Sequence, residues 1–168
     1  KAIRRQRQMC IRDRARSYFR SHAPAVLQDF IWWSGLPVSE AKQAIYLIES
    51  ELTAEQWNGQ TWYVHEACRT RGKVSGRLHL LPSYDEYLIS YKDRTDVLNK
   101  EYQHKAFNSF GIFRPVILYN GQIVGNWNKV IQKQTTHIEM NWFKKNTKIK
   151  RELLSLAERK YLTFFSEL

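Results

Sequence analysis

Apolar residues between positions 15 and 52 recur at the three- and four-residue spacing of helix faces. They form three stripes, which are Ala15, Tyr18, Phe19 and His22, then Leu27, Phe30, Ile31 and Ser34, then Ala41, Ile45, Ile48 and Leu52. Gly35 and Pro37 should end the second helix, because glycine supplies a C-cap and proline interrupts a helix. Ser39 is the expected N-cap of the third helix. The pattern therefore predicts three consecutive helices.

A hairpin is expected after the third helix. Asn58-Gly59 is a strong two-residue turn signal, and Trp57 and Trp62 lie on either side of it. Three helices followed by a hairpin are the order of a winged helix-turn-helix. We therefore predict a winged-helix domain over residues 15–70, followed by a loop over 69–76 that is rich in glycine and basic residues.

From residue 77 the pattern changes to strands. Leu78 and Leu80 alternate with polar residues, and a second Asn-Gly turn at Asn120-Gly121 separates strands at 116–119 and 122–131. Another alternating strand covers 137–142. A last amphipathic helix is expected at about 147–165. Residues 77–168 thus form a predicted second domain, and the fold class is α+β.

Composition excludes several classes of protein. With 168 residues, 43% of them hydrophobic and 26% charged, the chain has the composition of a folded protein and not of a disordered one. No apolar run approaches the roughly 18 residues of a membrane span, so no membrane association is expected. The two cysteines, Cys10 and Cys68, provide no disulfide framework, and no secretory segment is recognisable. The expected location is cytoplasmic.

The first fourteen residues carry a net charge of +5 of the chain's +11. Residues 4–14, RRQRQMCIRDR, resemble the in-frame translation of a transposase sequencing adapter. The interpretation is that residues 1–14 are an adapter-derived artefact and that the natural amino terminus is missing. The alternative is a natural arginine-rich arm that binds nucleic acid. The predicted fold therefore begins at Ala15.

Three segments resemble the carboxy-terminal half of winged-helix DNA-binding proteins related to the AlkZ and YcaQ DNA glycosylases. They are DFIWWSGL (Asp29–Leu36), LLPSYDEYLISYKDR (Leu80–Arg94) and PVILYNGQIVGNW (Pro115–Trp127). The resemblance implies tandem winged helices and a β-barrel that together form a concave surface for double-stranded DNA. The sheet of residues 77–168 is accordingly expected to be β-barrel-like, and the partners would include upstream winged-helix domains of the same protein. Val26 stands where similar sequences tend to carry threonine, so the capping box with Asp29 should be lost.

The resemblance also implies where catalysis lies. Its catalytic signature is Gln, an apolar residue, then Asp or Gln, on the first winged helix. The Gln-x-Gln strings of this chain, Gln6-Arg7-Gln8 and Gln132-Lys133-Gln134, carry a basic residue in the middle. No catalytic residue is therefore expected in this chain, although its parent could be a glycosylase of alkylated or cross-linked bases.

The other candidate catalytic and metal-binding residues are better explained by structural roles. The acidic cluster Asp85, Glu86, Asp93 and Asp96 could orient water in a glycosylase, but a structural ion pair between Asp85 and Arg94 is the favoured interpretation. His65 and Cys68 supply two metal ligands where zinc needs three or four. We expect no metal and no cofactor.

The candidate DNA-binding residues form a basic run near the carboxyl end. The run contains seven basic residues and one acidic residue, Glu139. The basic residues are Lys129, Lys133, Lys144, Lys145, Lys148, Lys150 and Arg151. Several precede or open the last helix, where the helix dipole disfavours cations, so a polyanion explains the placement better than stability does. The third helix carries more acidic than basic charge and is expected to pack, with Tyr46, against a missing upstream domain. A solvated basic face, in a non-enzymatic scaffold or protein-interaction module, is the alternative.

Overall fold

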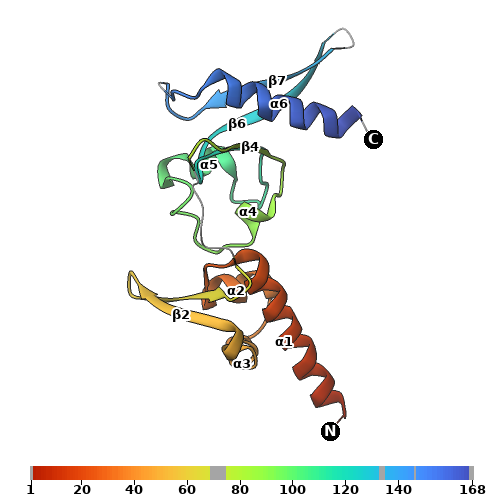
Figure 1. The fold of residues 1–168 in the computed structure, drawn as a ribbon, viewed down its shortest axis with the longest axis vertical. Helices are drawn as coiled ribbons and strands as arrows, with labels where there is room; N and C mark the ends of the chain where they lie inside the picture. The colour runs from red at the N-terminus through yellow and green to blue at the C-terminus, as the bar shows by residue number, and fades with distance from the viewer. Residues whose placement is uncertain (1, 69–74, 133–134, 146, 167–168) are drawn as a thin grey trace. The chain divides into compact units, whose positions relative to one another are not determined.

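The structure is a computed structural model that describes residues 2–68, 75–132, 135–145 and 147–166. It contains two compact units (Figure 1). Unit 1 comprises residues 1–72 and the short segment 89–93, and unit 2 comprises residues 73–88 and 94–168. No helix in the described ranges is both long and apolar enough to cross a membrane.

Unit 1 contains three helices and a three-stranded antiparallel sheet in the order β1-β3-β2. Its elements are α1 (Ala2–His22), β1 (Ala25–Val26), α2 (Leu27–Ser34), α3 (Val38–Tyr46), the 3-10 turn η1 (Glu49–Glu51), β2 (Leu52–Trp57) and β3 (Gln60–His65). The predicted order of three helices and a hairpin is present. Strand β1 was not predicted, because two residues are too few to show alternation.

The core of unit 1 is built from the predicted stripes. Tyr18, Phe19 and Phe30 are fully buried, and their rings lie 5.2–5.5 Å apart. Helix α1 also includes residues 2–14, which precede the start of the predicted fold. Ile11, four residues before Ala15 on the same helix face, is only 5% exposed. The core therefore extends into the segment before Ala15.

The helix caps agree with the prediction at Gly35 and differ from it at Ser39. Gly35 caps α2 with a left-handed φ of 66°, and its N–H donates to the carbonyl oxygen of Ile31, as predicted. Helix α3 begins at Val38, so the prediction of Ser39 as N-cap was wrong. Pro37 occupies the N-cap position, and its φ of −58° leads directly into the helix.

Unit 2 is a four-stranded antiparallel sheet with small helices and one long one. Its elements are β4 (Leu78–Leu81), α4 (Glu86–Ile89, whose last residue belongs to unit 1), η2 (Lys100–Tyr102), α5 (Gln103–Ala106), β5 (Val116–Tyr119), β6 (Gln122–Gln132), β7 (Thr135–Trp142) and α6 (Arg151–Ser166). The strand order β4-β5-β6-β7 leaves β4 and β7 at opposite edges, so the sheet of the described residues is open. The expected barrel is corrected to an open sheet, because no pairing joins the two edge strands.

Both Asn-Gly turns have the predicted geometry. Asn58 and Gly59 have φ values of 48° and 71°, and Asn120 and Gly121 have 50° and 82°. Two successive positive φ angles are the mark of a type I′ turn, whose twist matches that of paired strands. The last helix begins at Arg151 and not near 147, so the basic residues before it lie in an irregular segment.

Gly125 in β6 is the position where we expect a single added methyl group to destabilise unit 2. A Cβ atom there would lie 2.5 Å from the backbone oxygen of Asn141 on β7, which is too close for any real contact. Gly125→Ala should therefore cost about 2–3 kcal/mol, measured by chemical denaturation. Asn128→Ala, an exposed change on the same strand, is the control and should stay within about 0.5 kcal/mol. If Gly125→Ala were as stable as Asn128→Ala, the close approach of β6 and β7 at Gly125 would be contradicted.

Candidate nucleic-acid interface

The basic run lies on unit 2, along β6 and before α6. Lys129 is on β6 opposite Ile138 of β7, while Lys144, Lys145 and Lys148 follow β7. Lys150 and Arg151 open α6, and Lys133 lies outside the described residues. All six described members are exposed. The structure therefore places the cations where a large anion could reach them.

The charges after β7 are not neutralised locally. Lys144, Lys145, Lys148, Lys150 and Arg151 form no ion pair with any carboxylate that the structure describes. In unit 1, by contrast, Arg7 and Arg16 pair with Glu40 and Glu51. Cations near the positive end of a helix dipole raise the energy of the free protein by some tenths of a kcal/mol each. A bound polyanion would relieve that repulsion.

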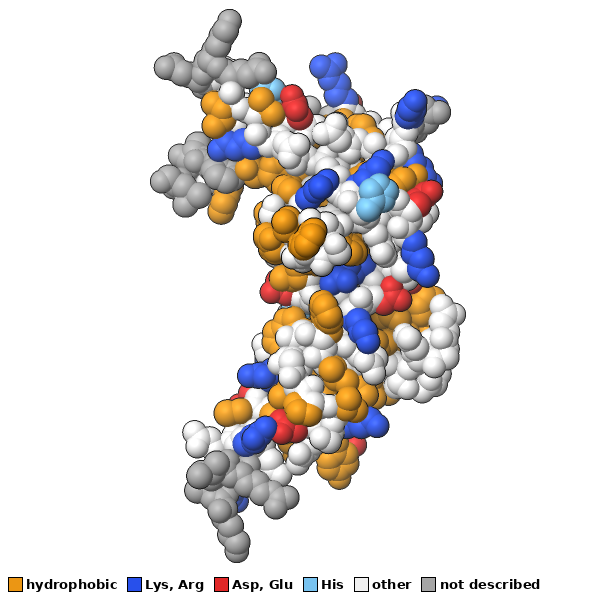
Figure 2. Space-filling model, turned by 180° about the vertical axis from the view of Figure 1, so that it is seen from behind, with side chains coloured by type: hydrophobic (Ala, Val, Ile, Leu, Met, Phe, Trp, Pro, Cys, Tyr) orange, Lys and Arg blue, Asp and Glu red, His pale blue; other side chains and the backbone are white. Residues whose placement is uncertain are grey.

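The distribution of charge is visible on the surface. Figure 2 shows lysine and arginine side chains standing apart from one another among hydrophobic and uncharged ones, with fewer acidic side chains between them. Separated cations suit the spaced phosphates of a nucleic-acid backbone better than they suit one compact anion.

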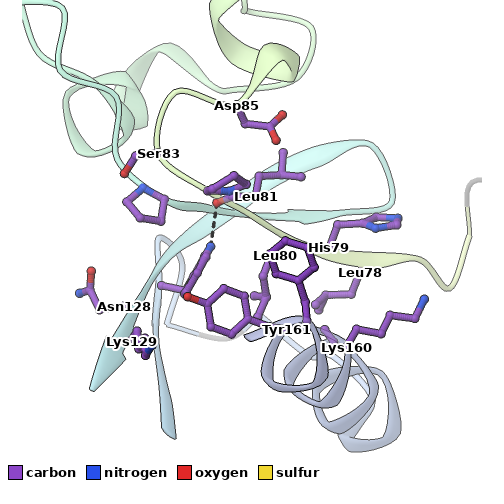
Figure 3. A pocket seen from close by; sticks show the side chains of 15 residues that line it. Leu78, His79, Leu80, Leu81, Ser83, Asp85, Asn128, Lys129, Lys160 and Tyr161 are labelled. Carbon is purple, nitrogen blue, oxygen red and sulfur yellow. Dashed lines mark hydrogen bonds between the residues drawn. The ribbon is translucent and has the colours of Figure 1, made fainter. Parts of the chain in front are cut away.

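A pocket of about 630 Å³ adjoins the basic run within unit 2 (Figure 3). Strand β4, Trp127 and helix α6 supply its walls, and Lys129 belongs both to the pocket and to the basic run. The indole N–H of Trp127 donates to the carbonyl oxygen of Leu81 at 2.8 Å, and its ring meets Tyr161 edge-on at 4.7 Å. These contacts hold the sheet and α6 together at the back of the pocket.

This pocket could not be predicted from the sequence. Its lining comes from separate segments of the chain, which are residues 78–83, Asp85, Pro115, 127–129 and one face of α6. Alternating hydrophobicity in β4 and β6 gave no sign that these segments would enclose a hollow. The aromatic residues Tyr161 and Phe164 of α6 were the available signal in the sequence, and Phe164 is 62% exposed.

Asp85 and Arg94, the expected ion pair, have different partners. A carboxylate oxygen of Asp85 accepts from the N–H of Tyr87 at 2.9 Å. Arg94 is buried, donates to the carbonyl oxygen of Leu88, and lies over the ring of Phe107 at 5.2 Å. An ion pair between them is not among the described contacts. The acidic cluster is also divided, because Asp93 belongs to unit 1 and its other members to unit 2.

Two of the family-like segments meet inside unit 1. Asp29 is 3% exposed, and its carboxylate accepts from the N–H groups of Val26 at 3.2 Å and Lys92 at 2.9 Å. The indole N–H of Trp32 donates to the carbonyl oxygen of Ile89 at 2.9 Å. Asp29 thus attaches the segment 89–93 to α2, and these residues have a structural role.

The expected loss of the capping box is half right. Val26 has no side-chain oxygen to accept from the helix, but Asp29 still accepts from the Val26 N–H. Burial raises the pKa of Asp29, and the N–H donors of Lys92, Val26 and Asp93 oppose that rise.

His65 and Cys68 are held by structural contacts as well. The ring of His65 contacts Glu51 at 3.2 Å through Nε2 and accepts from the Ala67 N–H through Nδ1. The thiol of Cys68 donates to the carbonyl oxygen of Phe19. Within the described ranges no group of three or more His, Cys, Asp or Glu side chains could hold a metal ion.

Glu51 gives a pH-dependent prediction. Hydrogen bonds from Arg16, and then from His65, lower the pKa of Glu51 from 4.5 to about 2. Its ionised form therefore stabilises the folded state above about pH 4.5, and this contribution is lost as the pH falls towards 2. Glu51→Gln should cost about 1 kcal/mol at neutral pH and progressively less in acid. Denaturation curves at several pH values would show this, with Glu55→Gln as the exposed control.

The tryptophans of unit 1 are divided between core and surface. Trp33 packs against the core of unit 1. Trp32 and Trp57 are 54% and 55% exposed. Trp33 therefore contributes to the core, whereas Trp57 lies at the end of the exposed β2–β3 hairpin.

Comparisons with known proteins agree with this architecture. The family model described as DNA glycosylase AlkZ-like matches residues 1–164. Among solved structures, the DNA glycosylase AlkZ of Streptomyces sahachiroi is similar, with a TM-score of 0.67 and 19% sequence identity. The alignment covers 90% of this chain and 40% of that chain. No curated protein matches. With nearly its whole length matched by the family model, this chain belongs to the AlkZ-like DNA glycosylase family.

Proposed function

We propose that this chain binds duplex DNA through its basic run and is the non-catalytic part of an AlkZ-like DNA glycosylase. The observation that carries the proposal is the set of five exposed cations between β7 and α6, which have no carboxylate partner in the described residues. Their contacts would be to phosphates, so the binding would be largely independent of base sequence.

The architecture supports a role in DNA binding. The order of helices and hairpin in unit 1 is that of a winged helix. The chain spans 40% of the length of the AlkZ structure, so the parent's catalytic residues would lie on a part that this chain does not contain. This chain would then position the DNA and leave the chemistry to that other part.

A surface of unit 1 favours a second role, docking of upstream winged-helix domains of the parent. Helix α3 exposes Val38 and Tyr46 at 52% and 66%, and Leu47 just after it at 36%. Glu40, which a DNA-reading helix would not favour, also lies on α3. Under the alternative function, a protein-interaction module, this surface would be the important one and the basic run would only be solvated.

The test compares two triple variants of equal charge. Lys144→Gln, Lys145→Gln and Lys148→Gln together should weaken binding to unrelated duplex sequences by the same factor, measured by fluorescence anisotropy. The control replaces Arg77, Lys100 and Arg114, three exposed basic residues elsewhere in unit 2, by glutamine. If both triple variants weaken binding equally, only net charge matters and the proposed interface is wrong.

The same proposal predicts no base release. Incubated with duplex DNA that carries alkylated or cross-linked purines, this chain should liberate no base above the rate of a protein-free control. The reason is that its two Gln-x-Gln strings carry Arg7 or Lys133 where the family signature has an apolar residue. Base release that is lost in Asp85→Asn or Asp93→Asn would place an active site in this chain and contradict the proposal.

A further inference from the structure

The pocket beside the basic run has the features of a ligand site. Its volume of about 630 Å³ lies in the usual range of small-molecule pockets, about 300–1,000 Å³. Leucines of β4, Pro82, Pro115 and Ala157 make most of the wall apolar. Such a wall favours a flat apolar body over a hydrated ion.

Aromatic rings and cations border the same hollow. Tyr161 and Phe164 lie one turn apart on α6, and Phe164 is 62% exposed. Lys160 extends from α6, and Lys129 comes from β6 (Figure 3). An aromatic surface beside lysines is the combination that binds a base together with its phosphate.

Asp85 adds a hydrogen-bond acceptor to the lining. One of its carboxylate oxygens accepts from the Tyr87 N–H, and the other has no hydrogen-bond partner among the described residues. In Figure 3 Asp85 lies on the opposite side of β4 from Tyr161 and Lys160. Asp85 therefore lies apart from the aromatic wall and is not counted among the contacts of the base.

We propose that this pocket holds one unstacked nucleotide, with its base against Tyr161 and Phe164 and its phosphate at Lys129. Lys129 belongs to both surfaces, so a nucleotide leaving the bound duplex could enter the pocket without leaving the cations. This inference rests on the proposed DNA binding for the source of the nucleotide, but a free mononucleotide has the same chemistry.

The experiment has two arms, both with the full chain. In the first, dAMP is titrated and the indole N–H resonance of Trp127 is followed by NMR. In the second, two duplexes with equal numbers of phosphates are compared, one fully paired and one with an adenine opposite an abasic site. Wild type should shift the Trp127 resonance with dAMP and prefer the duplex with the unpaired adenine about fivefold or more.

Single and triple variants distinguish binding in the pocket from binding by the basic run. Phe164→Ala should weaken dAMP binding about fivefold or more and abolish the preference for unpaired adenine, without changing the affinity for paired duplex. Phe110→Ala removes another exposed ring of unit 2, 88% exposed, and should change neither. The Lys144, Lys145 and Lys148 triple variant should weaken both duplexes equally and leave dAMP binding intact.

Failure of the nucleotide pocket and failure of the proposed DNA binding would give different results in these measurements. If dAMP leaves the Trp127 resonance unchanged and the two duplexes bind equally well, the nucleotide pocket is overturned while the proposed DNA binding stands. If neither duplex binds but dAMP still shifts Trp127 in a Phe164-dependent way, the DNA-binding function fails and the pocket is a site for free nucleotides. Equal losses in Phe164→Ala and Phe110→Ala would also overturn the pocket.

Discussion

Duplex binding by this chain should fall steeply with salt. Each phosphate neutralised contributes about 0.9 to the slope of log K against log salt, so six described cations would give a slope of up to about −5.4. Affinity would then fall by about 10³ between 50 and 200 mM salt. Neutralising Lys144, Lys145 and Lys148 should flatten the slope by up to about 2.7. The measurement is a series of binding isotherms at increasing salt.

The arginine-rich segment at the amino end needs its own control, because residues 1–14 carry +5. Deleting this segment would remove Ile11, which is buried in the core of unit 1. Replacing Arg4, Arg5 and Arg7 by glutamine removes charge and keeps Ile11. If this change flattens the salt slope and the Lys144, Lys145 and Lys148 change does not, DNA binding belongs to the amino-terminal segment. The basic run would then be only a solvated face.

Asp29→Ala should destabilise unit 1 by about 2–4 kcal/mol, because two or three backbone N–H groups would lose their buried acceptor. The local effect should be largest in segment 89–93, whose amide hydrogens would exchange about tenfold faster or more. Asp29→Asn keeps one acceptor oxygen and should be intermediate. Asp96→Ala, an exposed aspartate, is the matched control. A variant as stable as Asp96→Ala would show that the Asp29 contacts do not hold the segment.

The pH dependence at Asp29 has the opposite sign to that at Glu51. Burial raises the pKa of Asp29 in the folded state, so the ionised carboxylate is disfavoured there relative to the unfolded chain. Its protonated form therefore stabilises unit 1 at low pH, and this contribution is lost as the pH rises through the raised pKa. Relative to Asp29→Asn, which does not titrate, wild type should become more stable as the solution is acidified. Paired denaturation curves would test this sign.

Local sequence determined the elements whose signals lie within a few residues. The stripe of α2 with Gly35 after it, the Asn-Gly turns and the alternation of β7 all predicted what the structure contains. These features depend on backbone φ preferences and on side-chain spacing, which neighbouring residues set by themselves. The seven charges of the basic run could also be read from the chain, because a net charge needs no tertiary information.

Tertiary structure decided which of those residues meet. Two family-like segments were visible in the sequence, but only the fold shows that Asp29 and Trp32 bind the segment 89–93. Contacts between distant segments likewise determine three other features. They are the open edge of the sheet, the partner of Arg94 and the pocket between β4, β6 and α6. Local periodicity carries no information about such contacts, because they are fixed by how whole elements bury their apolar faces against one another.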